Sequence, residues 1–269
     1  MSRIALDRVT KVFGRRVDDA LALSRDRVGA SEIREQTGAT VALAETSLNV
    51  AAGEVFMIMG LSGSGKSTLL RLINRLIDPS SGRVAIDGTD INALSPAELR
   101  AVRRDRLAMV FQGFGLLPHR TVADNVGFGL EVQGVSEEAR HSAVADWITR
   151  VGLDGFTTAL PHELSGGMRQ RVGLARALAA GADILLMDEP FSALDPLIRR
   201  EMQGLLADLQ RDLGKTIVFV THDLSEAIRL GSRIAILKDG RIIQVGTGAE
   251  IVDAPADDYV RAFTEDLRT

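Results

Sequence analysis

The sequence contains no cysteine, which excludes disulfide bonds, thiolate metal sites and a cysteine nucleophile. Its apolar runs, such as Val55–Met59 and Ile184–Met187, are far shorter than the roughly 18 residues that a membrane-spanning helix needs. The N-terminal residues lack the apolar segment of a signal peptide, so we expect none. Basic residues are not in excess either. The 32 Lys and Arg stand against 36 Asp and Glu, for a net charge of -4, which gives no support to nucleic-acid binding.

What remains is ordinary globular composition, with 45% hydrophobic and 25% charged residues. A length of 269 residues suits one large domain or a domain with a subdomain. Apolar segments of strand length alternate with helical segments, which indicates an α/β fold with a mainly parallel sheet. The expected strands are residues 3–9, 41–50, 54–59, 84–87, 107–111, 184–188, 216–221, 233–238 and 241–245.

Helical patterns fill most of the intervals between these strands. Residues 66–77 place Leu69, Leu70, Ile73 and Leu76 on one face. Residues 121–152 read as helical throughout. The residues that recur there at every fourth position are Ala139, Ala143, Trp147 and Val151. The polar stretch 14–40 reads as an insertion with one or two short helices. A capping box, Thr247 with Glu250, predicts the start of a late helix.

The most specific motif follows the strand at 54–59 and matches G-x-x-x-x-G-K-[ST] at residues 60–67. Glycines let backbone N–H groups turn toward phosphates, and the helix that follows points its N-terminus at the anion. Lys66 would contact the β- and γ-phosphates, and the Ser67 hydroxyl is a hard oxygen ligand for Mg²⁺. The alternative is a plain glycine-rich turn. The predicted nucleotide-binding residues here are Gly60, Leu61, Ser62, Gly63, Ser64, Gly65, Lys66, Ser67 and Thr68.

Two further motifs carry chemistry in combination with the first. The apolar strand 184–188 ends in Asp188 and Glu189, which suit a Mg²⁺ shell and a general base for water. Alone, this pair would read as a solvated turn. Ser165, Gly166 and Gly167 open a helix and form a second possible anion site, with a simple helix cap as the alternative. One chain binding one nucleotide does not need two anion sites.

Together these motifs resemble the nucleotide-binding subunits of ABC transporters. Residues 60–67 resemble Walker A, 164–170 the ABC signature, 184–189 Walker B and 192–195 the D-loop. Gln112 lies where the family has its Q-loop glutamine, and His222 resembles the switch histidine. The six motifs occur in the family's order and the resemblance covers residues 1–255. It implies a P-loop NTPase of ABC type, with a RecA-like core, an N-terminal antiparallel β subdomain and an all-helical signature subdomain.

The resemblance also implies residue roles and cofactors. ATP and Mg²⁺ would be bound, the metal by Ser67, Gln112 and Asp188. Lys66, Gln112, Glu189 and His222 would be catalytic, with Glu189 activating water and His222 contacting the γ-phosphate. Asp195 of the D-loop would contribute to the nucleotide site, and it also reads as a helix N-cap before Pro196. Phe13 occupies the position of the family's adenine-stacking aromatic residue; the alternatives are a core role or displacement by the insertion.

The implied partners follow from the same likeness. Two copies would pack head to tail, with ATP on Walker A of one copy meeting Ser165 and Gly167 of the other. A membrane permease would be driven between two states, with Gln112 sensing it and residues 113–126 contacting it. For Phe114, Leu116 and Leu117 the alternative is local core packing. An extracytoplasmic binding protein would deliver the cargo, and the subunit would lie peripherally on the cytoplasmic face of the inner membrane.

The branch of the family is indicated by segments outside these motifs. Five parts of the sequence resemble the glycine betaine, proline and quaternary-amine importers. They are the insertion 14–40, residues 58–66, 72–77 and 109–112, and Met168 in the signature. The cargo stays open among glycine betaine, proline betaine, choline, proline, histidine and trimethylamine N-oxide. Another importer branch, an exporter, a soluble ABC ATPase acting on DNA or the ribosome, and a regulator that hydrolyses ATP poorly are the alternatives.

The expected domain plan is a single nucleotide-binding domain over residues 1–269. Its core would comprise about 1–112 and 160–245, the helical subdomain about 113–168, and the C-terminal helices 247–267. Many members of this branch continue into paired CBS domains; none is expected in this sequence.

Overall fold

The computed structural model describes residues 2–265, which form two units. Unit 1 comprises Met1–Ser95 and Val218–Thr269, and unit 2 comprises Pro96–Ile217. The boundary falls inside strand β8 (Thr216–Val220). Within residues 2–265, no helix combines the length and the apolar character needed to cross a bilayer.

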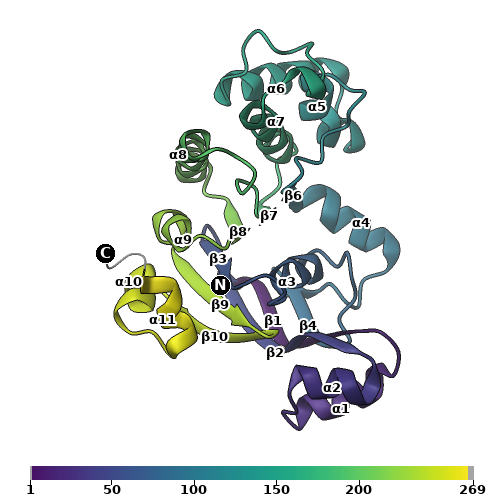
Figure 1. Ribbon diagram of the computed structural model, residues 1–269. Helices are drawn as coiled ribbons and strands as arrows, with labels where there is room; N and C mark the ends of the chain where they lie inside the picture. The colour runs from purple at the N-terminus through teal and green to yellow at the C-terminus, as the bar shows by residue number, and fades with distance from the viewer. Residues whose placement is uncertain (1, 266–269) are drawn as a thin grey trace. The chain divides into compact units, whose positions relative to one another are not determined.

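Unit 1 contains two groups of strands (Figure 1). An antiparallel sheet has the order β2-β1-β4-β5, and in the second group β10, β9, β3 and the end of β8 are neighbours in that order. Strands β3 and β9 are parallel, and every residue of β3 is buried. The elements of unit 1 other than its helices are β1 (Ser2–Phe13), β2 (Thr40–Ala51), β3 (Val55–Met59), β4 (Ser81–Ile86), β5 (Thr89–Asp90), β9 (Arg233–Lys238) and β10 (Arg241–Gly246).

The helices of unit 1 include the predicted insertion and the C-terminal segment. The insertion folds into two helices that lie side by side (Figure 1). Its buried residues Ala20, Leu21 and Ile33 pack with Val12 and Val41 of the adjoining strands, so the insertion has a small core of its own. The helices are α1 (Val17–Arg25), α2 (Ala30–Thr37), α3 (Lys66–Ile73), α9 (Leu224–Leu230), α10 (Gly248–Asp253) and α11 (Asp258–Thr264).

Unit 2 combines a parallel strand pair with a helical cluster. Strands β6 (Leu107–Phe111) and β7 (Ile184–Asp188) pair in parallel over their whole length. Helices α5 (Val122–Val132), α6 (Glu137–Arg150) and α7 (Gly166–Ala179) lie together (Figure 1). Their buried apolar side chains form one core. Leu116 packs against this core and is partly buried, as the alternative of local packing predicted. The other elements are α4 (Pro96–Asp105), the short 3-10 helix η1 (Pro161–Glu163) and α8 (Pro196–Leu213).

The α/β class, the mainly parallel second sheet and the antiparallel first sheet are confirmed. The capping box of Thr247 and Glu250 is also present, at the start of α10. The first strand continues to Phe13 instead of ending near residue 9. Its register shifts between Leu6 and Val9, where Arg8 has a φ of 43°. This bulge interrupts the alternation of side chains, which made the strand look shorter.

Two helical expectations were wrong in detail. Helix α3 ends at Ile73, because Arg75 adopts a left-handed conformation with a φ of 51°; Leu76 is therefore outside the helix and 52% exposed. Residues 121–152 form two helices, α5 and α6, with a break between Val132 and Glu137. Of the residues at every fourth position, Val151 is buried and Ala143 and Trp147 pack against the core of the helical cluster, whereas Ala139 is exposed. A spacing of four residues drifts by about 40° per step around a helix of 3.6 residues per turn, so Ala139, three steps before Val151, lies off the buried face.

Candidate nucleotide-binding site

The phosphate loop of unit 1 joins β3 to α3, and two of its glycines are required by space. A Cβ on Gly60 would lie 2.3 Å from the carbonyl oxygen of Leu237, and one on Gly65 would lie 2.4 Å from that of Ala42. Both have positive φ angles, 150° and 103°. No other residue type fits these positions, so the strand β9 and the strand β2 determine the path of the loop.

The interior of the loop has the properties of an anion cradle. Lys66 is only 6% exposed, and its Nζ donates to the carbonyl oxygens of Gly60 at 2.8 Å and Leu61 at 3.0 Å. The buried Ser64 hydroxyl has no hydrogen-bond partner among the described residues, and the space beside Gly63 is open. The N-terminus of α3 follows directly. A cation, an unpaired hydroxyl and free space at a helix N-terminus fit a phosphate group.

The remaining predicted residues of the loop differ in exposure. Leu61, Ser62 and Gly63 are exposed, whereas Gly65, Ser67 and Thr68 are half-buried. The hairpin turn after β9 supports the loop, because the Gly240 N–H donates to the Ser64 carbonyl oxygen over 3.1 Å. The Gly240 carbonyl oxygen in turn accepts from the Ala44 N–H over 2.9 Å.

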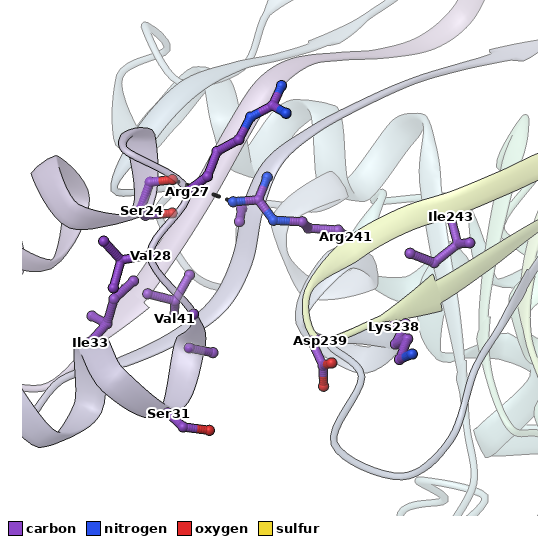
Figure 2. Close-up of a pocket in the computed structure, with 13 residues that line it drawn as sticks. Ser24, Arg27, Val28, Ser31, Ile33, Val41, Lys238, Asp239, Arg241 and Ile243 are labelled. Atoms are coloured by element: carbon purple, nitrogen blue, oxygen red, sulfur yellow. Dashed lines mark hydrogen bonds between the residues drawn. The ribbon is translucent and has the colours of Figure 1, made fainter. Parts of the chain in front are cut away.

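The same hairpin also reaches the insertion. Arg241 donates through Nη2 to the carbonyl oxygen of Ser24 over 3.3 Å, as Figure 2 shows. Between the hairpin and the insertion lies a cavity of about 420 Å³, whose lining includes Val28, Lys238 and Ile243. The same hairpin thus binds two segments. Its Gly240 N–H bonds the phosphate loop at Ser64, and its Arg241 side chain bonds the insertion at Ser24.

Phe13, the predicted adenine-stacking residue, ends β1 and is 43% exposed, so the core alternative is wrong. It pairs with Thr40, two residues before Ala42, whose carbonyl oxygen lies against Gly65. Lys11 Nζ is 4.9 Å from the centroid of its ring. The insertion begins after Phe13 and leaves its ring accessible, and adenine stacking stays a prediction.

His222 is exposed and lies two residues after the end of β8. The Thr221 N–H donates to the carbonyl oxygen of Ile58 over 3.1 Å, so His222 emerges beside the strand that leads into the phosphate loop. The buried Thr221 hydroxyl contacts Glu226 over 2.5 Å, and Asp223 caps α9. These contacts fix the backbone on both sides of His222 while its imidazole stays accessible.

In unit 2 the predicted acidic residues and Gln112 lie at the carboxyl ends of two adjacent strands. Phe111 of β6 pairs with Asp188 of β7, and Gln112 and Glu189 follow them in sequence. The Gln112 Nε2 donates to the Ser192 hydroxyl over 3.1 Å, and this hydroxyl donates to the Glu189 carbonyl oxygen over 3.0 Å. The structure thereby brings the Q-loop, Walker B and D-loop residues together.

The signature residues begin α7, with Ser165 as N-cap. Its hydroxyl accepts from the Met168 N–H over 3.2 Å, so the cap interpretation is confirmed. Gly166 and Gly167 form the first turn, and a Cβ on Gly167 would lie 2.5 Å from Cγ2 of Ile198. Asp195 caps α8, with Pro196 in its first turn, as the sequence predicted. A second anion-binding role for these termini stays a prediction.

The residues predicted to hold Mg²⁺ are oxygen donors. The predicted donors are Ser67 in unit 1 and Gln112 with Asp188 in unit 2. Hydroxyl, amide and carboxylate oxygens suit this cation, which usually combines one or two carboxylates with substrate phosphates and water. Residues 2–265 contain no cluster of three His, Asp or Glu side chains able to hold a metal. These ligands stay predictions.

Two contacting residues were missed by sequence reasoning. Ser192 was considered only as part of the D-loop motif, yet it links Gln112 to the Glu189 backbone. Tyr259 of α11 accepts a hydrogen bond from the Leu61 N–H over 3.1 Å. It is the only tyrosine in the sequence, but nothing in the sequence indicates that the C-terminal segment reaches the phosphate loop.

Comparisons with known proteins agree with this arrangement. The ABC transporter family profile matches residues 43–192. The glycine betaine/carnitine transport ATP-binding protein GbuA of Listeria monocytogenes is 51% identical over 99% of this chain and 67% of its own length. The glycine betaine/proline betaine transport system ATP-binding protein ProV of Escherichia coli is 53% identical over 97% of this chain and 65% of its own. The chain thus spans about two thirds of the length of these relatives.

The fold comparison leads to the same family. The dimeric, ADP- and Pi-bound structure of the ATP-binding cassette MJ0796 has a TM-score of 0.76 and 36% identity, over 91% of this chain and 98% of that one. GbuA and ProV each match nearly the whole of this chain. The chain therefore belongs to the ATP-binding subunits of ABC transporters, in the glycine betaine and quaternary-amine importer family.

Proposed function

We propose that the chain hydrolyses ATP to energise the import of a small osmolyte or quaternary amine through a membrane permease. The observation that carries this proposal is the phosphate loop with buried Lys66 and with the buried Ser64 hydroxyl, which has no hydrogen-bond partner within residues 2–265. The loop belongs to a chain at least 51% identical to two betaine-transport subunits. The substrate class rests on those relatives.

The roles proposed for the residues follow from their chemistry. Lys66 would exchange its carbonyl partners for the β- and γ-phosphates, and the backbone N–H groups of the loop would bind the same oxygens. Glu189 would accept a proton from the attacking water, and His222 would hold the γ-phosphate. Mg²⁺, held by Ser67, Gln112 and Asp188, would neutralise phosphate charge. Phe13 would stack on adenine.

The proposed assembly has three kinds of partner. A second copy would pack head to tail, so that Ser165, Gly167 and Asp195 of one copy complete the nucleotide site of the other. The permease would hold the subunit peripherally on the cytoplasmic face of the inner membrane, and an extracytoplasmic binding protein would deliver cargo to the permease. In the segment with Phe114, Leu116 and Leu117, the Phe114 ring is half-buried. The guanidinium carbon of Arg169 lies over it, 5.0 Å from the ring centroid. Permease contact by this segment is also a proposal.

The test is purification of the full chain with its permease and binding protein from native membranes, followed by uptake in proteoliposomes loaded with ATP, with the binding protein supplied outside. Labelled glycine betaine, choline, proline, histidine and trimethylamine N-oxide would be compared. We expect ATP-dependent uptake of at least one quaternary amine or zwitterionic osmolyte, and none with the Glu189→Gln variant. Recovery of an exporter, or uptake restricted to histidine, would contradict the proposed substrate class and leave the ATPase assignment intact.

A further inference from the structure

The peptide group between Gly60 and Leu61 is bound at both of its ends. Lys66 Nζ donates to its carbonyl oxygen over 2.8 Å, and its N–H donates to the hydroxyl of Tyr259 over 3.1 Å. Lys66 belongs to the phosphate loop itself, whereas Tyr259 belongs to α11, about 200 residues along the chain. Two side chains therefore set the orientation of a single peptide plane at the start of the loop.

The hydroxyl of Tyr259 also connects this peptide to the neighbouring strand. It donates to the carbonyl oxygen of Leu237 over 3.0 Å. The same carbonyl oxygen lies 2.3 Å from the place where a Cβ of Gly60 would be, so loop and strand are in close contact here. One hydroxyl thus uses its donor and its acceptor capacity to join the end of β9 to the start of the phosphate loop.

The ring of Tyr259 is held from two sides, which fixes where its hydroxyl points. Phe263 meets it edge to face, with the ring centroids 5.2 Å apart and an angle of 85°. Lys238 Nζ lies 4.8 Å from its centroid. The next residue, Val260, is fully buried, and Asp257 caps the helix through the Val260 N–H at 2.8 Å. Such support is what a side chain needs to position another group accurately.

We propose that Tyr259 is a positioning residue for ATP binding. When Lys66 moves to the phosphates, the Gly60 carbonyl oxygen loses that donor, and the hydroxyl of Tyr259 keeps the peptide from rotating. Without the hydroxyl the loop would sample more conformations, and ATP would bind with the added cost of ordering it. This inference rests on the proposed ATP-binding activity and is independent of the cargo.

The test is the Tyr259→Phe variant of the full chain, which removes the hydroxyl and keeps the ring. We expect the Kd and the KM for ATP to rise about 2- to 12-fold, the range for one lost hydrogen bond, with kcat within about twofold. Because ground-state and transition-state binding are lost together, KM carries the effect. Without nucleotide, the amide hydrogen of Leu61 should exchange with solvent faster by a similar factor.

A second variant, Phe263→Leu, removes the ring that supports Tyr259 and leaves the hydroxyl in place. The hydroxyl can still accept from the Leu61 N–H but is held less firmly, so we expect the exchange of the Leu61 amide and the KM for ATP to rise, and by less than in Tyr259→Phe. The inference would be overturned if Tyr259→Phe left both the exchange of the Leu61 amide and the Kd for ATP unchanged. It would also be overturned if the KM for ATP rose equally in both variants while the exchange of the Leu61 amide stayed unchanged. The exchange measurement needs no ATP, so it separates failure of this inference from failure of the proposed function.

Discussion

The side-chain amide of Gln112 donates a hydrogen bond to the hydroxyl of Ser192 over 3.1 Å. The same hydroxyl donates to the backbone carbonyl of Glu189 over 3.0 Å. Glu189 has a φ of 45°, a left-handed conformation that is costly for a residue with a side chain. Ser192 thus holds the peptide that follows Glu189, the proposed general base. It also links this peptide to Gln112, the residue proposed to sense the permease.

Replacing Ser192 by alanine should therefore loosen the backbone of Glu189. We expect Ser192→Ala to lower the free energy of unfolding by about 1–2 kcal/mol, because two hydrogen bonds lose their partner. Turnover should fall more than ATP affinity, because the base is displaced while the phosphate loop is unaffected. Urea unfolding and steady-state kinetics measure both. Ser142→Ala, at an exposed position on α6, is the control. If Ser192→Ala and Ser142→Ala had the same free energy of unfolding and the same turnover, the role given to Ser192 would be contradicted.

Two glycines of the phosphate loop should respond differently to the same substitution. In Gly60→Ala the Cβ would lie 2.3 Å from the Leu237 carbonyl oxygen, and a backbone group of β9 cannot give way. We expect the free energy of unfolding to fall by about 3 kcal/mol or more. Gly63 has a φ of 81° but open space around it, so Gly63→Ala should cost only about 1–2 kcal/mol of backbone strain. Thermal unfolding compares them, and a larger loss in Gly63→Ala would refute the packing argument.

The carboxylate of Glu250 should titrate below the usual range of glutamate. The Thr247 backbone N–H, at 2.7 Å, and then the Thr247 hydroxyl, at 3.1 Å, bond its charged form and lower its pKa. Since the pKa is lower in the folded state, the stabilisation is present above the usual glutamate pKa and is lost as pH falls through the folded value. Carbon NMR titration measures this pKa.

Thr247→Ala removes the hydroxyl and keeps the backbone N–H, so it should return the pKa of Glu250 part of the way toward its usual value. An ordinary pKa for Glu250 in the wild type would show that the capping box at the start of α10 does not form in solution.

The sequence predicted what depends on local patterns. The strands, the phosphate loop and the caps at Ser165, Asp195 and Thr247 follow from periodicity and from residue types whose backbone preferences are strong. Helix α3 ended earlier than expected because Arg75 takes a left-handed conformation. An arginine in the sequence gives no indication of a positive φ. Its guanidinium reaches the carbonyl oxygens of Ile91 and Leu94 at 2.9 Å, so a contact distant in sequence stabilises that turn.

The contacts of Tyr259 and Ser192 could not be predicted for a related reason. Each depends on which backbone groups the fold places beside a hydroxyl, and this is determined by the strand order and the path of the C-terminal segment. The roles of Gln112 and His222 came only from the resemblance to the family, because an isolated glutamine or histidine in a loop has no specific pattern. The exposure of Phe13 was likewise decided by the fold, in which the insertion helices pack beneath β1 at Val12.

The central claim is that this chain binds ATP through its phosphate loop and hydrolyses it with Glu189. The most direct test is single-turnover ATP hydrolysis by wild-type protein and Glu189→Gln, with the Kd for ATP determined on both. The account predicts an unchanged Kd, hydrolysis at least about 100-fold slower in the variant, since general-base catalysis contributes about that much or more, and accumulation of ATP-bound dimers. Equal hydrolysis rates in the two proteins would contradict it.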